Sequence, residues 1–296
     1  MSSDKSRSKD SERTENLRAI LRVPANRPAA AQLLADLQPG STPAGPSGKK
    51  AAAKAMKAYA GELAGLQERL FANARGGADR RVLLVLQGMD TSGKGGVVEH
   101  VLGLVNPGGI RMHAFKAPTE EEKRHDFLWR VRQALPGEGQ IGIFDRSHYE
   151  DVLIVKVHQL ASDAEIHERY EKINAFEREL TDDGYTIVKC FLNISKETQK
   201  ERLLARLDDP QKHWKFNPGD IDERARWDDY QSAYFEALTR CTSDAAPWYA
   251  VPSDHKWYRN WAVGQLLLET LRELDPQFPQ MHFDVQEQRE RLLAAG

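Results

Sequence analysis

Residues 81–96 read RVLLVLQGMDTSGKGG, an apolar run that leads directly into a glycine-rich turn. The run at 82–86 is apolar at every position, which is typical of a parallel strand buried on both faces. The turn matches the pattern GxxxxGK at residues 88–94, and an amphipathic stretch begins near Val97. A strand, this pattern and a helix in that order form the context in which such a loop binds phosphate. A turn without a ligand is the alternative, but it gives no packing role to a lysine among three glycines.

The residue types of this loop indicate an anion site. Glycines let backbone N–H groups converge on phosphate oxygens, the helix N-terminus adds a partial positive charge, and Lys94 adds a full one. Gly95 stands where a Ser or Thr hydroxyl normally coordinates magnesium, so another group must hold the metal. We predict Asp90, because a carboxylate this close to phosphates repels them unless a cation lies between. The predicted phosphate-binding residues are Gly88, Met89, Thr91, Ser92, Gly93, Lys94, Gly95 and Gly96, with Thr91 and Ser92 as helpers at the metal.

Strand and helix signals alternate along the rest of the chain. Further strands are predicted at 110–115, 141–145 and 185–193, with a weaker one at 248–252, and a helix at 51–74 leads into the core. Alternation of this kind favours a parallel sheet with helices on both faces, because right-handed crossovers place helices on each side. The prediction is an α/β protein with a parallel sheet covered by helices on both faces.

The two ends of the chain differ from its middle. Residues 1–50 have little apolar periodicity and include a Pro, Gly and Ala rich stretch at 38–50, which predicts a mostly disordered tail and linker. Residues 17–23 are the exception and are expected to dock as a strand or helical turn. We assign 51–275 to the P-loop kinase-like domain and 276–296 to a C-terminal tail or helix.

The composition limits the possible protein classes. At 296 residues with 40% hydrophobic residues, one main domain with a sizeable core is the simplest interpretation. The apolar run at 82–86 is far shorter than the roughly 20 residues that cross a bilayer, and no secretory signal precedes it, so we predict a cytoplasmic protein without membrane contact. The net charge of −2 argues against a nucleic-acid partner. Cys190 and Cys241 have no metal-binding spacing and allow at most one disulfide, so we predict no functional role for either.

A second acidic strand ends at Asp145. In enzymes with this kind of loop, such a strand supplies a second carboxylate beside the phosphates, so we predict that Asp145 binds magnesium directly or through water. Arg146 follows and either clamps a phosphate or simply pairs with Asp145. A purely structural Asp–Arg pair and a functional site fit this pattern about equally well. His148 is interpreted as a structural histidine.

Residues 195–216 carry a basic helix and the turn after it. Arg202 and Arg206 are four residues apart and share a helix face, as in the mobile lid that closes over phosphates in small kinases. We place this lid around 196–230. Interleaved acidic residues also fit a solvated surface, which the charge pattern alone slightly favours.

Residues 116–130 leave the second strand with charged and aromatic residues together, where a second substrate is expected. The predicted nucleotide-binding residues are Lys116, Asp126, Trp129 and Arg130. For the aromatic residues, a place in the core is the commoner outcome.

Four stretches in fixed order resemble the family-2 polyphosphate kinases, most closely the subgroup acting on both nucleoside mono- and diphosphates. They are GMDTSGKGG (88–96), FKAPTEEEKRHDFLWR (115–130), DRSHYEDVL (145–153) and KHWKFNPGDIDERARWDDY (212–230). The resemblance implies a three-layer P-loop NTPase-like fold with a helical lid and dependence on magnesium, with Mn²⁺ as the alternative ion. It also implies polyphosphate as phosphoryl donor, AMP/ADP or GMP/GDP as acceptor, and a homo-oligomer, either dimer or tetramer. Residues 1–14 and the tail after 275 lie outside it.

Carried over by position, the resemblance makes Asp90 and Asp145 metal-binding carboxylates and places Lys94 and Arg146 on phosphates. It makes Arg202 and Arg206 lid arginines and adds Lys212 and Lys215 as basic lid residues. The predicted catalytic residues are Asp90, Lys94, Asp145, Arg146, Arg202 and Arg206. The alternatives are an ATP-dependent nucleoside or nucleotide kinase of related fold, and a non-catalytic module that binds polyphosphate or RNA.

Overall fold

A five-stranded parallel sheet forms the centre of the computed structural model, which describes residues 17–280 and 282–295. The strands lie in the order β2-β3-β1-β4-β5. Their bounds are β1 (Arg81–Gln87), β2 (Ile110–Ala114), β3 (Ile141–Asp145), β4 (Tyr185–Asn193) and β5 (Trp248–Pro252). All five predicted strands are confirmed. Strands β1, β3, β4 and β5 are buried at nearly every position, as expected for strands between two helical layers. Strand β2 lies at the edge of the sheet and is exposed at 111–114.

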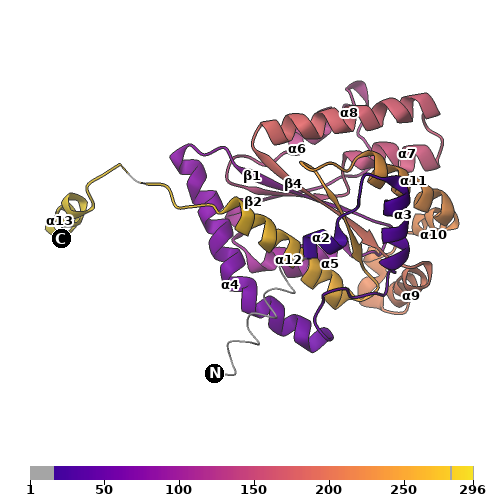
Figure 1. The fold of residues 1–296 in the computed structure, drawn as a ribbon, viewed down its shortest axis with the longest axis horizontal. Coiled ribbons are helices and arrows are strands. Elements are labelled where there is room, and N and C mark those ends of the chain that lie inside the picture. The colour runs from indigo at the N-terminus through magenta and orange to yellow at the C-terminus, as the bar shows by residue number, and fades with distance from the viewer. Residues whose placement is uncertain (1–16, 281, 296) are drawn as a thin grey trace.

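Helices cover both faces of the sheet, which confirms the predicted three-layer α/β arrangement (Figure 1). Helices α4, α5 and α12 pack together on one face, and α8 packs against β4 on the other. The helices are α2 (Leu17–Leu21), α3 (Arg27–Asp36), α4 (Lys49–Asn73), α5 (Lys94–Val101), α6 (Trp129–Ala134), α7 (Ile154–Val157), α8 (Asp163–Asp182), α9 (Lys196–Leu207), α10 (Gly219–Ala225), α11 (Trp227–Arg240), α12 (Lys256–Leu274) and α13 (Val285–Ala294). Short 3₁₀ turns include η4 (Glu122–Arg124), η5 (His148–Val152) and η6 (Pro210–Lys215).

Helix α12 is the most deeply buried helix, with residues 258–271 all buried. It is enclosed by α2, α4, α5 and the sheet, so that even its polar residues lie inside the protein. Three residues separate its first turn from the end of β5, so this turn lies near the carboxyl ends of the strands. This position matters for the site described below.

The segment before α4 differs from the predicted disordered linker. Leu17, Leu21 and Val23 are buried, and the Val23 N–H donates to the Trp248 carbonyl at 2.8 Å, which covers the outer side of β5. The expected docking of residues 17–23 is thus confirmed as a helical turn followed by a β-bridge. The Pro and Gly rich part is also held, since the Pro39 carbonyl accepts from the Asp254 N–H at 3.0 Å. Proline and glycine prevent regular structure there, but they do not prevent contacts. Residues 1–16 lie outside the described part of the chain.

The C-terminal segment leaves the body of the protein after α12 and ends in α13 (Figure 1). In residues 17–280 and 282–295, no helix is both long and apolar enough to cross a membrane.

Candidate active site

The glycine-rich loop joins β1 to α5, as the sequence predicts. Gly93 adopts φ +109°, a left-handed conformation that favours glycine, immediately before α5 begins at Lys94. The Lys94 side chain is buried and its Nζ donates to the Gly88 carbonyl at 2.8 Å, while the Ser92 N–H donates to the Met89 carbonyl at 3.0 Å. These contacts close the loop into a cradle. The first N–H groups of α5 have no acceptor within the helix, so they can donate hydrogen bonds to an anion.

Asp90 and Arg146 meet across two neighbouring strands. Strands β1 and β3 pair in register, Leu86 opposite Asp145, so the residues after both strands emerge at one edge of the sheet. Arg146 Nη2 donates to Asp90 Oδ1 at 2.8 Å. Burial lowers the pKa of Arg146, but the carboxylates of Glu150 and Asp90 outweigh it and hold the pKa above its ordinary value. The structure therefore pairs Arg146 with Asp90, where the sequence suggested a phosphate or Asp145.

A cavity of about 200 Å³ opens beside the loop. It is lined by Gly88, Met89, Asp90 and Arg146, together with acidic residues of two other segments. These acidic residues are Glu150 in η5, Asp220 in α10 and Glu223 in α10. Burial raises the pKa of Asp220, and the nearby Asp90 carboxylate adds to the rise. Burial also raises the pKa of Glu150. The cavity thus gathers more negative than positive charge.

Sequence reasoning missed these three acidic residues. Glu150 follows Asp145 by five residues, and Asp220 stands after the turn Asn217-Pro218-Gly219, so both lie inside recognised motifs. The signal that could have identified them is an acidic residue inside a motif already assigned to the site. The cluster of charged residues at 220–224, which reads DIDER, hid that signal because it resembles a solvated helix face.

The basic residues of the predicted lid do not line this cavity. Arg202 donates to the Thr91 carbonyl at 2.8 Å and to the Ser253 and Asp254 carbonyls at 2.6 and 2.7 Å. Its guanidinium thus contacts backbone oxygens beneath the loop. Arg206 donates to the Lys215 carbonyl at 2.9 Å and lies 3.4 Å from Asp220, so it ties α9 to the segment that follows. Lys212 and Lys215 are exposed on η6.

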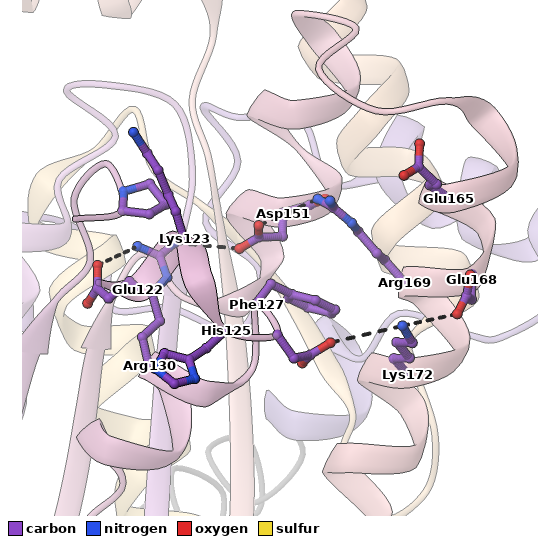
Figure 2. Close-up of a pocket in the computed structure, with 12 residues that line it drawn as sticks. Glu122, Lys123, His125, Phe127, Arg130, Asp151, Glu165, Glu168, Arg169 and Lys172 are labelled. Carbon is purple, nitrogen blue, oxygen red and sulfur yellow. Dashed lines mark hydrogen bonds and ion pairs between the residues drawn. The ribbon is translucent and has the colours of Figure 1, made fainter. Parts of the chain in front are cut away.

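A second, larger cavity of about 390 Å³ lies beside the segment predicted to bind the nucleotide (Figure 2). Asp126 and Arg130 line it, as do Arg169 and Lys172 of α8. Arg130 is buried, donates to the Lys116 carbonyl at 2.8 Å and approaches Asp151 Oδ2 at 3.5 Å. Lys172 Nζ lies 4.0 Å from Asp126 Oδ2 and 3.0 Å from Glu168 Oε1, and Figure 2 shows Glu168 beside Lys172.

Trp129 is placed differently from the prediction, because it is absent from the lining of this cavity. Its ring stacks on His125 with centroids 4.2 Å apart, and His125 lines the cavity instead. Lys116 contributes its backbone carbonyl to Arg130, and its side chain is exposed.

A family model described as Polyphosphate kinase 2 matches residues 47–279, which include both cavities and the loop. The chain belongs to the polyphosphate kinase 2 family. The family resemblance drawn from the four sequence motifs is thereby confirmed.

Relatives of this polyphosphate kinase 2 chain carry assigned activities. An AMP/ADP-polyphosphate phosphotransferase of Meiothermus ruber is 47% identical over 82% of this chain and 89% of its own length. An ADP-polyphosphate phosphotransferase of Rhodopseudomonas palustris is 43% identical over 74% of this chain and 78% of its own length. The crystal structure of polyphosphate kinase 2 from Arthrobacter aurescens TC1 is 51% identical, covers 88% of this chain and 92% of that one, and superposes with a TM-score of 0.86. The chain is therefore a phosphotransferase.

Phosphotransferases of this family generally depend on a divalent metal ion. In the described residues, no group of three or more His, Cys, Asp or Glu side chains forms a complete metal site. Magnesium does not need one, since it binds through one or two carboxylates and takes its other ligands from phosphates and water. Thr91 Oγ1 and Ser92 Oγ are buried without a hydrogen-bond partner among residues 17–280 and 282–295. Together with Asp90, these oxygens fit such a partial ligand set.

Proposed function

We propose that this chain transfers a phosphoryl group between inorganic polyphosphate and a purine nucleotide, AMP/ADP or GMP/GDP. The observation that carries the proposal is the closed loop at 88–96 with Lys94, beside the Asp90–Arg146 pair, in a member of the polyphosphate kinase 2 family. The relatives that act on AMP and ADP with polyphosphate support the same pair of substrates for this chain.

The reaction needs charge compensation rather than a general base. An oxygen of the acceptor phosphate is already ionised near neutral pH and forms the new P–O bond. The bond to the terminal phosphoryl group of the donor breaks, and the shortened polyphosphate leaves as an anion. Repulsion between two polyanions is the main obstacle, so catalysis consists of positioning and electrostatic stabilisation. We assign these roles to Lys94, to the loop N–H groups and to Arg146.

The bound cation proposed is Mg²⁺, with Mn²⁺ as the alternative. Asp90, Asp145 and the hydroxyl groups of Thr91 and Ser92 would hold it, and when bound it supplies positive charge between carboxylates and phosphate oxygens. The excess of carboxylates in the cavity supports this proposal, because Asp90, Glu150 and Asp220 repel an incoming phosphate unless cations offset them.

We place the nucleotide in the larger cavity. Asp126 offers a hydrogen-bond acceptor, and Arg169 and Lys172 offer positive charge on α8. The sequence assigned the aromatic contact with the nucleotide to Trp129. We assign it instead to His125, whose ring Trp129 orients by stacking. The Asp126→Asn variant should raise KM for the nucleotide several-fold and leave KM for polyphosphate unchanged. An unaltered KM for the nucleotide in steady-state assays would count against this placement.

Residues 196–230 are proposed to act as the lid, with Lys212, Lys215 and Arg206 meeting polyphosphate on closure. The exposed position of Lys212 and Lys215 supports a role in capturing a long anion whose only recognisable features are charge and shape. A cytoplasmic location and a homo-oligomeric state stay predictions.

The function is tested by supplying polyphosphate, Mg²⁺ and AMP or ADP and measuring ATP. The Lys94→Ala and Asp90→Ala variants should lose at least about a hundredfold in turnover, because each removes charge compensation at the reacting phosphate. Lys54→Ala, which removes an exposed lysine of α4, is the matched control. Product from ATP and a nucleoside, with none from polyphosphate, would replace the proposal by an ATP-dependent kinase. Near-normal turnover in Lys94→Ala would overturn the role of the loop.

A further inference from the structure

A buried guanidinium lies behind the phosphate loop. Arg259 belongs to the first turn of α12, and only 3% of its surface is exposed. Its Nη1 donates to the Ser92 carbonyl at 3.0 Å, while Nη2 and Nε donate to Asn260 Oδ1 at 2.8 and 3.1 Å. No ion pair joins Arg259 to a carboxylate in the described part of the chain. The charge is therefore solvated by neutral oxygens alone.

Two of the loop glycines make room for this side chain. A Cβ atom at Gly93 would lie 1.6 Å from Arg259 Nη1, and one at Gly96 would lie 2.5 Å from Nη2. A Cβ atom at Gly95, between them, would point into open space. The loop and Arg259 thus fit each other at two specific positions, and the glycines at 93 and 96 serve that contact as well as the backbone conformation.

A second guanidinium supports the same stretch of backbone. Arg202 donates to the Thr91 carbonyl at 2.8 Å, next to the Ser92 carbonyl held by Arg259. Carbonyl oxygens repel phosphate, whereas the N–H groups of the same loop attract it. By binding two successive carbonyls, the two arginines fix the loop in the orientation that leaves its N–H groups for an anion.

The charge of Arg259 is costly where it lies. Burial, and then the nearby charge of Arg202, lower the pKa of Arg259 from its ordinary 12.5 to about 9, so the group is still a cation at neutral pH. A buried cation without a counter-charge destabilises a protein unless something else compensates it. A phosphate bound to the N–H groups of the loop at 88–96 would bring such a counter-charge.

We propose that Arg259 is a positioning residue of the phosphate site, which holds the loop in its anion-binding form and takes the bound phosphate as its counter-charge. This inference rests on the proposed phosphate-binding function of the loop. It adds a residue more than 160 positions away in sequence to the machinery of phosphoryl transfer.

The test introduces a carboxylate beside the Arg259 guanidinium and keeps the hydrogen bonds of that guanidinium. Asn260→Asp keeps an oxygen that accepts from Nε and Nη2 but neutralises the guanidinium from within the protein. Pyrophosphate affinity, measured by titration calorimetry, should fall about tenfold, since one unit of nearby positive charge is cancelled. The free protein should be at least as stable in urea unfolding as the unsubstituted protein. Arg272→Met, which removes a surface arginine from the same helix, should leave pyrophosphate affinity unchanged.

Steady-state kinetics add a readout that a purely structural residue would not move. KM for polyphosphate should rise about tenfold in Asn260→Asp, in parallel with the loss of pyrophosphate affinity. Arg259→Lys should bind pyrophosphate better than Arg259→Met, because it keeps the charge. If the unsubstituted protein binds pyrophosphate and turns over polyphosphate, and Asn260→Asp matches it, the role of Arg259 is overturned while the proposed function stands. If the unsubstituted protein binds no pyrophosphate, the proposed function itself fails.

Discussion

Two cations are buried on opposite faces of the sheet, and they are compensated in different ways. Lys189 of β4 faces α8 and donates to Glu177 Oε2 at 2.5 Å, to Tyr149 Oη at 2.9 Å and to the Cys241 carbonyl at 2.5 Å. Arg259, on the side of α12, has a carbonyl and an amide oxygen as acceptors. Lys189 thus finds its counter-charge inside the chain, and Arg259 does not.

The difference separates a structural charge from a functional one. Burial alone raises the pKa of Glu177, but Lys189 and His148 reverse this and hold the pKa below its ordinary value. His148, whose Nε2 lies 3.2 Å from Glu177 Oε1, is a structural histidine as predicted. The paired charges of Lys189 and Glu177 anchor the segment that carries Arg146. The proposal for Arg259 is that a bound anion supplies the counter-charge that the described residues lack.

Removing the internal counter-charge should have the largest effect on stability. Glu177→Gln leaves the Lys189 ammonium buried and unpaired, so we expect a loss of about 3–5 kcal/mol in the free energy of unfolding. Urea unfolding measures it, with Glu62→Gln, which breaks the surface pair with Arg272, as a control expected to cost about 0–1 kcal/mol. Equal losses in the two variants would erase the distinction between buried and surface pairs.

The same contribution should depend on pH with a defined sign. Because the pKa of Glu177 is lower in the folded protein than its ordinary 4.5, its stabilisation is complete above about pH 4.5. It is lost as the pH falls through the folded pKa. The stability gap between the unsubstituted protein and Glu177→Gln should therefore be constant from pH 7 to 5 and shrink below 4.5. A gap that widens on acidification would contradict this assignment.

On the other face, the fit of Arg259 between two glycines should show as a difference between neighbouring positions. Gly93→Ala forces a Cβ atom onto the guanidinium at a left-handed φ, with an expected cost of about 2–3 kcal/mol. Gly95→Ala meets nothing and sits in a helix, so it should be neutral or stabilising by up to about 1 kcal/mol. Thermal unfolding of both variants makes the comparison, and equal effects would show that Arg259 does not occupy that space.

The smallest expected effect on stability is that of Asp220, a carboxylate whose charge is only partly compensated. The pKa of Asp220 is raised, so its charged form destabilises the free protein, and Asp220→Asn should stabilise it by less than about 1 kcal/mol at pH 7. The gain should vanish as the pH falls below about 3.8, the ordinary pKa of this carboxyl, because Asp220 is then protonated in both states. Added Mg²⁺ should raise the unfolding midpoint less than in the unsubstituted protein. Asp222→Asn, an exposed neighbour on α10, is the control for both readouts.

The sheet and the loop were predictable because their signals are local. An unbroken apolar run at 82–86 specifies a buried strand, and the glycines with Lys94 specify the turn after it. The edge segment at 17–23 gave only a weak signal, since seven residues are too few to show a period. Its docking depends on β5, more than 220 residues away.

Arg259 was not predictable, because its role is set by tertiary contact alone. It lies in a helix whose sequence reads as an ordinary buried helix, and nothing near it resembles a phosphate site. Gly96 was a faint hint, since a helix interior has little use for glycine. The sequence predicts Arg202 as a lid arginine, whereas in the structure its guanidinium donates to the loop backbone and does not line the cavity.

A crystal structure with pyrophosphate and Mg²⁺ tests the central claim most directly. The account predicts a phosphate in the loop at 88–96, in contact with Lys94, and a metal ion between that phosphate and Asp90. Arg259 should remain against the Ser92 carbonyl behind it. An empty loop with pyrophosphate bound elsewhere, or an Asp90 carboxylate turned away from the metal, would contradict the account.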